Sequence, residues 1–236
     1  MGKETEQKQE IVNQGVHTYS QEEAYVWPEE PVLREQLEWF QDQKLALMVH
    51  WGMYNQLGMV ASWALSDEDA EWSRKTVDWT DDGELFKRQY RALNRAFNPV
   101  AFQPEEWAKM AKKCGFRYLI LTTKHHDGFC LWDTAYTEYK TTAEECPFHT
   151  HKYADIVRAM FDAFRKEGLG IGAYFSKADW HCPDYWETEK ALTRKTTRNP
   201  TYDPKENPEA WERFRAFTRD QILELGKQYG RLDILW

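Results

Sequence analysis

The stretch PEEWAKMAKKCGFRYLILTTKHHDGF, residues 104–129, holds the pattern that decides the fold. Pro104 suits a first helical position, acidic residues follow it, and lysines precede Gly115, which together predict a helix over about 104–113. The apolar run 118–121 comes next and indicates a strand buried on both faces, as in a parallel sheet. Polar and ring-bearing side chains then occupy 122–129. A helix that leads directly into a buried strand predicts an α/β fold built from βα units.

The same order of helix and strand recurs along the chain. Apolar runs at 45–49, 169–175 and 232–236 predict three more buried strands, and helical patterns at 156–164 and 207–230 precede the last two. A complete (β/α)₈ barrel needs about 30 residues per unit, so four strands in 236 residues are too few for one. The pattern predicts either an open α/β sheet or the first four units of a barrel. No strand is followed by a glycine-rich phosphate loop, which argues against a nucleotide-binding sheet.

The ends of the chain differ in character. Residues 1–30 are polar and end in the proline-rich segment 27–31, so we expect an N-terminal arm followed by one domain over 31–236. Residues 1–14 contain no apolar stretch, so no signal peptide is expected in the chain as given, and its compartment stays open. No apolar run approaches the roughly 18 residues that a membrane helix needs.

Composition narrows the class of partner. The chain has 39 acidic and 31 basic side chains and a net charge of −8, which argues against nucleic acid or an anionic membrane surface. Its 12 Trp, 12 Tyr and 12 Phe make up 15% of the residues, and flat aromatic faces suit stacking on sugar rings. The four cysteines show no C-x-x-C spacing and are expected to be ordinary thiols.

Candidate functional residues lie where the predicted strands end, because the carboxyl ends of parallel strands converge on one mouth. His50 follows the first strand, and a lone histidine there is commonly structural. The pair His125 and His126, with Asp127 beside it, follows the second strand and is costly to desolvate without a purpose. Tyr174 lies in the third strand and fits either a core or a site.

Two other chemistries remain as alternatives. A metal-dependent barrel takes inward-pointing ligands at i and i+2 of a strand, whereas adjacent histidines in a strand would point to opposite sides. A Ser-His-Asp triad would need Ser176, which lacks a G-x-S-x-G context. We therefore expect neither a metal nor another cofactor.

The strand ends also resemble a known family, the α-L-fucosidases of glycoside hydrolase family 29. The resemblance covers roughly residues 25 to 236, and the block TKHHDGFCLWD at 123–133 is its most specific part. The remaining matching motifs are HWG at 50–52, EW at 71–72, FNP at 97–99, GAYFS at 172–176, DWH at 179–181 and DILW at 233–236.

The resemblance implies a (β/α)₈-like barrel that releases terminal α-linked L-fucose from glycans with retention of configuration. It assigns fucose binding to six residues by matching positions. These are His50, Glu71, Trp72, His125, His126 and Tyr174. On composition alone, Glu71 and Trp72 would be a surface pair.

In the family, the nucleophilic aspartate lies two residues after the tryptophan that matches Trp236, and the acid/base residue lies further on. The resemblance therefore implies that the 236 residues are a truncated catalytic domain without a catalytic carboxylate, and Asp233 is expected to be structural. We expect the chain alone to hydrolyse no fucoside and to self-associate through exposed edges of its half barrel. A catalytically inactive fucose-binding protein and a metal-dependent barrel hydrolase remain the competing interpretations.

Overall fold

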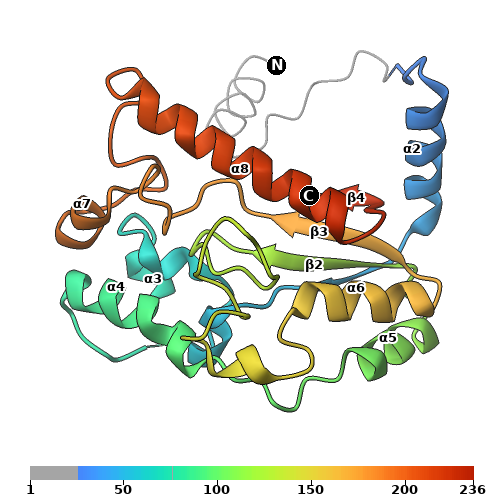
Figure 1. Ribbon diagram of the computed structural model, residues 1–236, viewed down its shortest axis with the longest axis horizontal. Coiled ribbons are helices and arrows are strands. Elements are labelled where there is room, and N and C mark those ends of the chain that lie inside the picture. The colour runs from blue at the N-terminus through green and yellow to red at the C-terminus, as the bar shows by residue number, and fades with distance from the viewer. Residues whose placement is uncertain (1–25, 76) are drawn as a thin grey trace, which may run out of the picture. The chain divides into compact units, whose positions relative to one another are not determined.

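Four parallel strands form the sheet: β1 (Ala46–Val49), β2 (Tyr118–Lys124), β3 (Gly170–Phe175) and β4 (Ile234–Leu235). They lie in the order β1-β2-β3-β4, so each strand pairs with its neighbours in sequence (Figure 1). This order is that of a barrel wall, whereas a doubly wound sheet reverses its order. The βα prediction is confirmed, and the strand order favours the barrel over the open sheet.

The computed structural model describes residues 26–75 and 77–236. The predicted arm at 1–30 lies outside the described residues as far as position 25. Helix α2 (Pro31–Gln43) begins where Glu30 accepts hydrogen bonds from the amides of Val32 and Leu33. The chain divides into residues 1–42 and a second unit, residues 43–236, which contains the sheet.

Within the described residues, six further helices and four 3₁₀ turns connect the strands. The helices are α3 (Ala70–Ser73), α4 (Gly83–Arg91), α5 (Pro104–Lys113), α6 (Ile156–Lys166), α7 (Thr188–Thr193) and α8 (Pro208–Gln228). The turns are η1 (Met53–Leu57), η2 (Ser62–Leu65), η3 (Ala92–Ala96) and η4 (Pro147–Thr150). The three predicted helices are confirmed as α5, α6 and α8. Their starts follow the expected chemistry, since Asn207 caps α8 by accepting the amide of Ala210 and Asp155 caps α6 by accepting that of Arg158.

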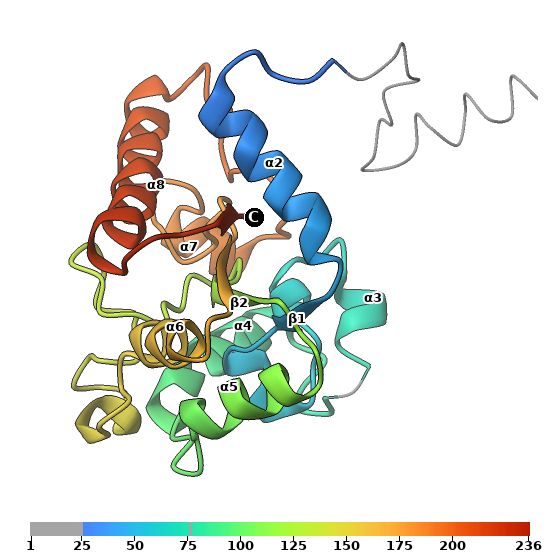
Figure 2. The same cartoon turned by 90° about the vertical axis from the view of Figure 1, so that its right-hand side faces the viewer.

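Helices cover one side of the sheet. Figure 2 looks nearly along the strands and shows α5, α6 and α8 in an arc around it. Helix α6 packs on β2 and β3 and buries Ile156, Met160, Phe161 and Phe164 completely. Burial of each such side chain stabilises the fold by about 1.5–3 kcal/mol.

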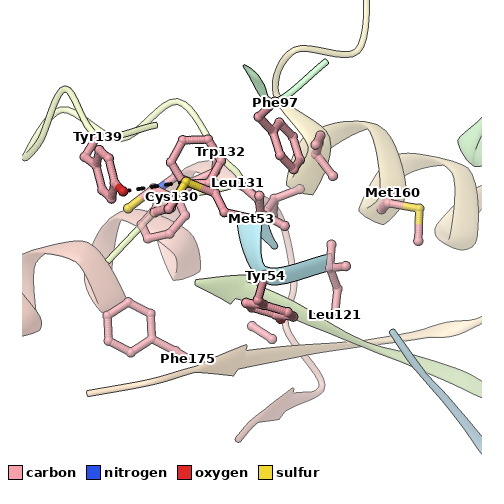
Figure 3. Packing of buried hydrophobic residues seen from close by; sticks show 14 of the residues in the cluster. Met53, Tyr54, Phe97, Leu121, Cys130, Leu131, Trp132, Tyr139, Met160 and Phe175 are labelled. Carbon is pink, nitrogen blue, oxygen red and sulfur yellow. Dashed lines mark hydrogen bonds between the residues drawn. The ribbon is translucent and has the colours of Figure 1, made fainter. Parts of the chain in front are cut away.

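The long loop between β2 and α6 carries its own part of the core (Figure 3). Cys130, Leu131 and Trp132 have no exposed surface. The hydroxyl of Tyr139 donates to the Arg91 carbonyl at 2.8 Å and lies 3.6 Å from the Met53 sulfur. The Trp132 indole donates to Glu224 of α8 at 2.8 Å, which ties the loop to that helix. The loop is therefore packed against η1 and α8.

The prediction that all four strands are covered on both faces is wrong for β1 and β4. Every residue of β2 is buried, but Met48 of β1 is 42% exposed, and Leu235 and Trp236 are 53% and 61% exposed. The difference arises because β1 and β4 are the outer strands of the described sheet, each with a neighbour on one side. Strand β2 also continues three residues beyond the predicted 118–121, to Lys124.

Candidate functional site

Three successive strands bring imidazole and phenol rings together at their carboxyl ends. His50 follows β1, and its ring centroid lies 5.0 Å from that of His125 and 5.2 Å from that of Tyr174. His125 and His126 follow β2, with their ring centroids 4.8 Å apart. Tyr174, in β3, stacks on His125 at 6.1 Å. We call His50, His125, His126 and Tyr174 the ring cluster.

Two threonines align the strand ends that carry the ring cluster. The hydroxyl of Thr122 donates to the carbonyl of Val49 at 3.1 Å, and that of Thr123 donates to the carbonyl of Tyr174 at 2.9 Å. Both side chains are buried, so these bonds satisfy polar groups that would otherwise be costly. They also explain why β2 stays extended as far as the histidines.

A buried ion pair anchors the next position. The Lys124 ammonium has no exposed surface and lies 2.6 Å from the Asp179 carboxylate and 2.8 Å from the amide oxygen of Gln221. The rings of Phe175 and Phe217 face it at 4.6 and 5.0 Å. Burial raises the pKa of Asp179, but attraction to Lys124 outweighs this and leaves that pKa below its usual value. The carboxylate is therefore held in its charged form.

The turn after the histidines requires glycine. Gly128 has a φ of +78°, and a Cβ there would lie 2.4 Å from the Asp179 carboxylate oxygen and 2.7 Å from Cβ of His181. Beside it, Asp127 is buried and accepts hydrogen bonds from the Tyr90 hydroxyl at 2.9 Å and the Phe129 amide at 3.2 Å. Burial raises the pKa of Asp127 to about 7. Asp127 therefore shapes the turn and does not point to the ring cluster as a free carboxylate.

The histidines of the ring cluster are held in their neutral forms. Burial lowers the pKa of His125 well below its usual value, and its neighbours His126 and His50 lower it further. Burial also lowers the pKa values of His50 and His126. Neutral imidazoles each offer one hydrogen-bond donor and one acceptor, which suits them to hydroxyl groups.

Their hydrogen bonds leave one ring nitrogen of each member of the pair available. His125 Nδ1 lies within hydrogen-bond distance of the hydroxyl and the amide of Ser62, and His126 Nδ1 bonds to the Ala178 carbonyl at 2.8 Å. Within residues 26–75 and 77–236, Nε2 of neither ring makes a hydrogen bond. These two Nε2 atoms are the groups that the pair can offer to a ligand.

A wall of indole rings borders the histidine pair. Trp63 of η2 lies 5.6 Å from His125 and 5.0 Å from His126, measured between ring centroids. Trp180 stacks on His126 at 4.8 Å, and Trp186 stacks on Trp180 at 4.8 Å with their planes 6° apart. The aromatic content of the sequence is therefore concentrated in part beside the predicted site.

Glu71 and Trp72 lie in α3, and both are exposed, Trp72 by 53%. The Trp72 indole donates to the Asp69 carboxylate at 3.1 Å, and the Arg198 guanidinium binds the same carboxylate with two nitrogens at 2.6 and 3.0 Å. Arg198 also lies 4.5 Å above the Trp63 ring. Trp72 is thereby connected to the indole wall, whereas Glu71 makes no hydrogen bond or ion pair within the described residues.

Sequence reasoning missed Ser62, Trp63 and Arg198. None of the three follows a predicted strand, and Arg198 lies 129 positions from its partner Asp69. Their relation to the site follows only from long-range packing.

Trp236, the last residue of the DILW motif at 233–236, stacks near Tyr174 with ring centroids 6.3 Å apart.

Among the described residues, no group of three or more His, Cys, Asp or Glu side chains is arranged to hold a metal ion. The Ser176 hydroxyl is buried without a hydrogen-bond partner in this part of the chain, so it forms no triad with the histidines. No described helix is long and apolar enough to cross a bilayer. His125 and His126 lie beyond the end of β2, where the alternation of side chains along a strand does not apply, and both rings lie beside that of Trp63.

Comparison with known proteins identifies the relatives of this arrangement. The profile of the family described as alpha-L-fucosidase matches residues 12–236. The chain belongs to the α-L-fucosidase family. The plasma α-L-fucosidase of Rattus norvegicus is 29% identical over 158 residues, which cover 66% of this chain and 33% of the rat protein. The chain therefore spans about a third of this curated relative.

Solved α-L-fucosidase structures match the fold. The α-L-fucosidase isoenzyme 1 from Paenibacillus thiaminolyticus is 35% identical, with a TM-score of 0.62. The match covers 86% of this chain and 42% of the Paenibacillus chain. A GH29 α-L-fucosidase from Bacteroides thetaiotaomicron is 30% identical with a TM-score of 0.63, covering 90% and 42%. The latter structure holds a trapped covalent intermediate, in complex with 2-fluoro-fucosyl fluoride. The four parallel strands of this chain and the helices between them thus correspond to part of the fold of these α-L-fucosidases.

Proposed function

We propose that these residues carry the fucose-binding part of a retaining exo-α-L-fucosidase that acts on terminal α-linked L-fucose of oligosaccharides or glycoconjugates. The observation that carries the proposal is the ring cluster, in which the ring centroids of His50, His125 and Tyr174 lie 5.0–6.1 Å apart and that of His126 lies 4.8 Å from that of His125. Sugar hydroxyls both donate and accept, and neutral imidazoles and a phenol answer both needs. The membership of the chain in the α-L-fucosidase family supports the choice of sugar.

Glu71 and Trp72 complete the proposed binding set from α3. Trp72 offers an exposed indole face, which suits the apolar side of a deoxysugar ring. Glu71 offers a carboxylate that is exposed and unbonded in the described structure, so it can accept from a sugar hydroxyl without giving up a bond.

The reaction proposed is a double displacement. A carboxylate oxygen bonds to the anomeric carbon while the bond to the leaving oxygen breaks, and a carboxylic acid gives its proton to that oxygen. Water then attacks the anomeric carbon, gives a proton to the second carboxylate, and displaces the first. The covalent intermediate trapped in the Bacteroides relative fits this two-step course.

The carboxylates of Asp127, Asp179 and Asp233 are committed to structural contacts. Asp127 binds the Tyr90 hydroxyl, and Asp179 binds Lys124. Asp233 accepts the amide of Ile171 at 2.8 Å and pairs with Arg231. We therefore propose that the 236-residue chain by itself binds fucose without hydrolysing fucosides.

The test titrates the chain with L-fucose and follows tryptophan fluorescence, with D-fucose as the enantiomeric control. We expect saturable millimolar binding of L-fucose and no binding of D-fucose. The fluorescence should report the binding, because Trp63 and Trp72 lie beside the proposed site. His126→Ala should abolish it, whereas His149→Ala, an exposed change outside the ring cluster, should not. Equal responses to both enantiomers would refute fucose recognition. Release of the phenol from an aryl α-L-fucoside would refute the proposal that this chain does not hydrolyse fucosides.

We further propose that the chain self-associates through β1 and β4. These outer strands expose Met48 and Leu235, and an exposed apolar edge strand is a template for pairing. Sedimentation should show oligomers that grow with concentration. Leu235→Lys should reduce them, while Val100→Lys, at an exposed apolar position outside the sheet, should not. A monomer at every concentration would contradict the proposal.

A further inference from the structure

The contacts around the adjacent histidines define which ring nitrogen of each carries the proton. The amide of Ser62 points to His125 Nδ1 at 3.4 Å. A backbone amide can only donate, so Nδ1 must be the acceptor. The Ser62 hydroxyl accepts from the Asp127 amide at 3.2 Å, which leaves its own proton to donate to the same Nδ1. Nε2 of His125 must therefore carry the single proton of the neutral ring.

His126 has the opposite arrangement. Its Nδ1 lies 2.8 Å from the carbonyl oxygen of Ala178, which can only accept, so Nδ1 carries the proton. Since the ring is held neutral by burial, Nε2 presents a lone pair. The adjacent rings thus offer unlike groups, an N–H from His125 and a bare nitrogen from His126.

We propose that Ser62 is a positioning residue that fixes His125 as the Nε2–H tautomer, so that the histidine pair presents one donor and one acceptor to two neighbouring hydroxyl groups of a sugar. The part that concerns the sugar rests on the proposed function, whereas the tautomers do not. His125 is 98% buried around a polar edge that has no partner within the described residues, which is the situation of a ligand-binding group.

The arrangement also explains how the chain selects its ligand. A pair of identical tautomers would meet two hydroxyls with two donors or two acceptors. The unlike pair lets one hydroxyl accept from His125 and the other donate to His126, and it leaves an unpaired nitrogen if either hydroxyl is missing. A deoxy analogue that lacks one of the two hydroxyls therefore binds poorly, because a site with an unsatisfied buried group rejects such an analogue.

The test measures the tautomers directly, by nitrogen NMR of the 236-residue chain with ¹⁵N-labelled histidine and without sugar. The resonances of His125 and His126 are assigned by their loss in single variants. The expected result is an Nε2–H form for His125 and an Nδ1–H form for His126. Any other protonation of His125 overturns the proposal, and this outcome needs no variant at Ser62.

Ser62→Ala then tests the role of Ser62. His125 should lose its single tautomer, and L-fucose should bind about tenfold more weakly, the effect of losing one such hydrogen bond. Ser66→Ala is the matched control, because Ser66 is equally buried four positions away and bonds to neither histidine. An unchanged His125 tautomer in Ser62→Ala refutes the positioning role. If the tautomers are as expected but no sugar binds, the proposed function fails and the assignment of the tautomers stands.

Discussion

Asp179→Asn isolates the ion pair that supports the end of β2. The change removes the charge that faces Lys124 but keeps an oxygen that can accept the amides of His181 and Cys182, so the loop loses no backbone bond. The Lys124 ammonium has no exposed surface, and removal of one partner of a buried pair typically costs about 3–5 kcal/mol. Gln221 and two phenyl rings stay in place around the ammonium, which favours the lower end, about 3 kcal/mol.

Urea unfolding of the wild type and the variant measures this loss. Asp184→Asn is the matched control, because Asp184 pairs with Arg213 at the surface and such pairs contribute about 0–1 kcal/mol. The pH dependence provides a second check. The folded-state pKa of Asp179 is lowered, so its contribution is present above the unfolded pKa near 3.9 and is lost as the pH falls through the folded value. Equal losses in Asp179→Asn and Asp184→Asn would refute the structural role of the buried pair.

Three further changes probe the same region. Asp127 has a folded pKa of about 7, so its ionisation lowers the free energy of unfolding as the pH rises from about 4 to 7. In urea titrations, Asp127→Asn should remove up to about 1.4 kcal/mol per pH unit of this decline, and pH dependences that run parallel in wild type and variant would contradict it. Gly128→Ala should lower the free energy of unfolding by about 1–3 kcal/mol, because the added Cβ would overlap Asp179 and His181. Gly58→Ala should cost less, because Gly58 shares the positive φ but a Cβ there has no atom within 4 Å, and equal losses would show that no overpacking occurs. Arg198→Lys should weaken L-fucose binding several-fold in calorimetry, because it removes the two-nitrogen bond to Asp69, the carboxylate that binds the Trp72 indole. The free energy of unfolding should change by less than about 1 kcal/mol, and an unchanged affinity would show that Trp72 takes no part in binding.

The local signals in the sequence predicted the elements well where short-range chemistry determines them. Pro104 and the lysines before Gly115 define α5, and Asn207 defines the start of α8. The strand ends were also predictable, because parallel strands must deliver His50, the histidine pair and Tyr174 to one edge.

The sequence did not reveal what holds these side chains in place. Lys124 looked like one polar residue among several, and only the fold brings it to Asp179, 55 positions later. Ser62 lies 63 positions before His125, in a short 3₁₀ turn without a recognisable pattern. The exposure of β1 and β4 could not be read from their apolar composition, since burial depends on the neighbours that a strand has in the sheet.

A crystal structure of the chain soaked with L-fucose tests the central claim most directly. The account predicts the sugar within hydrogen-bond distance of the imidazoles of His125 and His126, with Trp72 beside it. Fucose bound only elsewhere would contradict it, for example in the apolar pocket of about 710 Å³ that Tyr185, Trp211 and Ile222 line along α8.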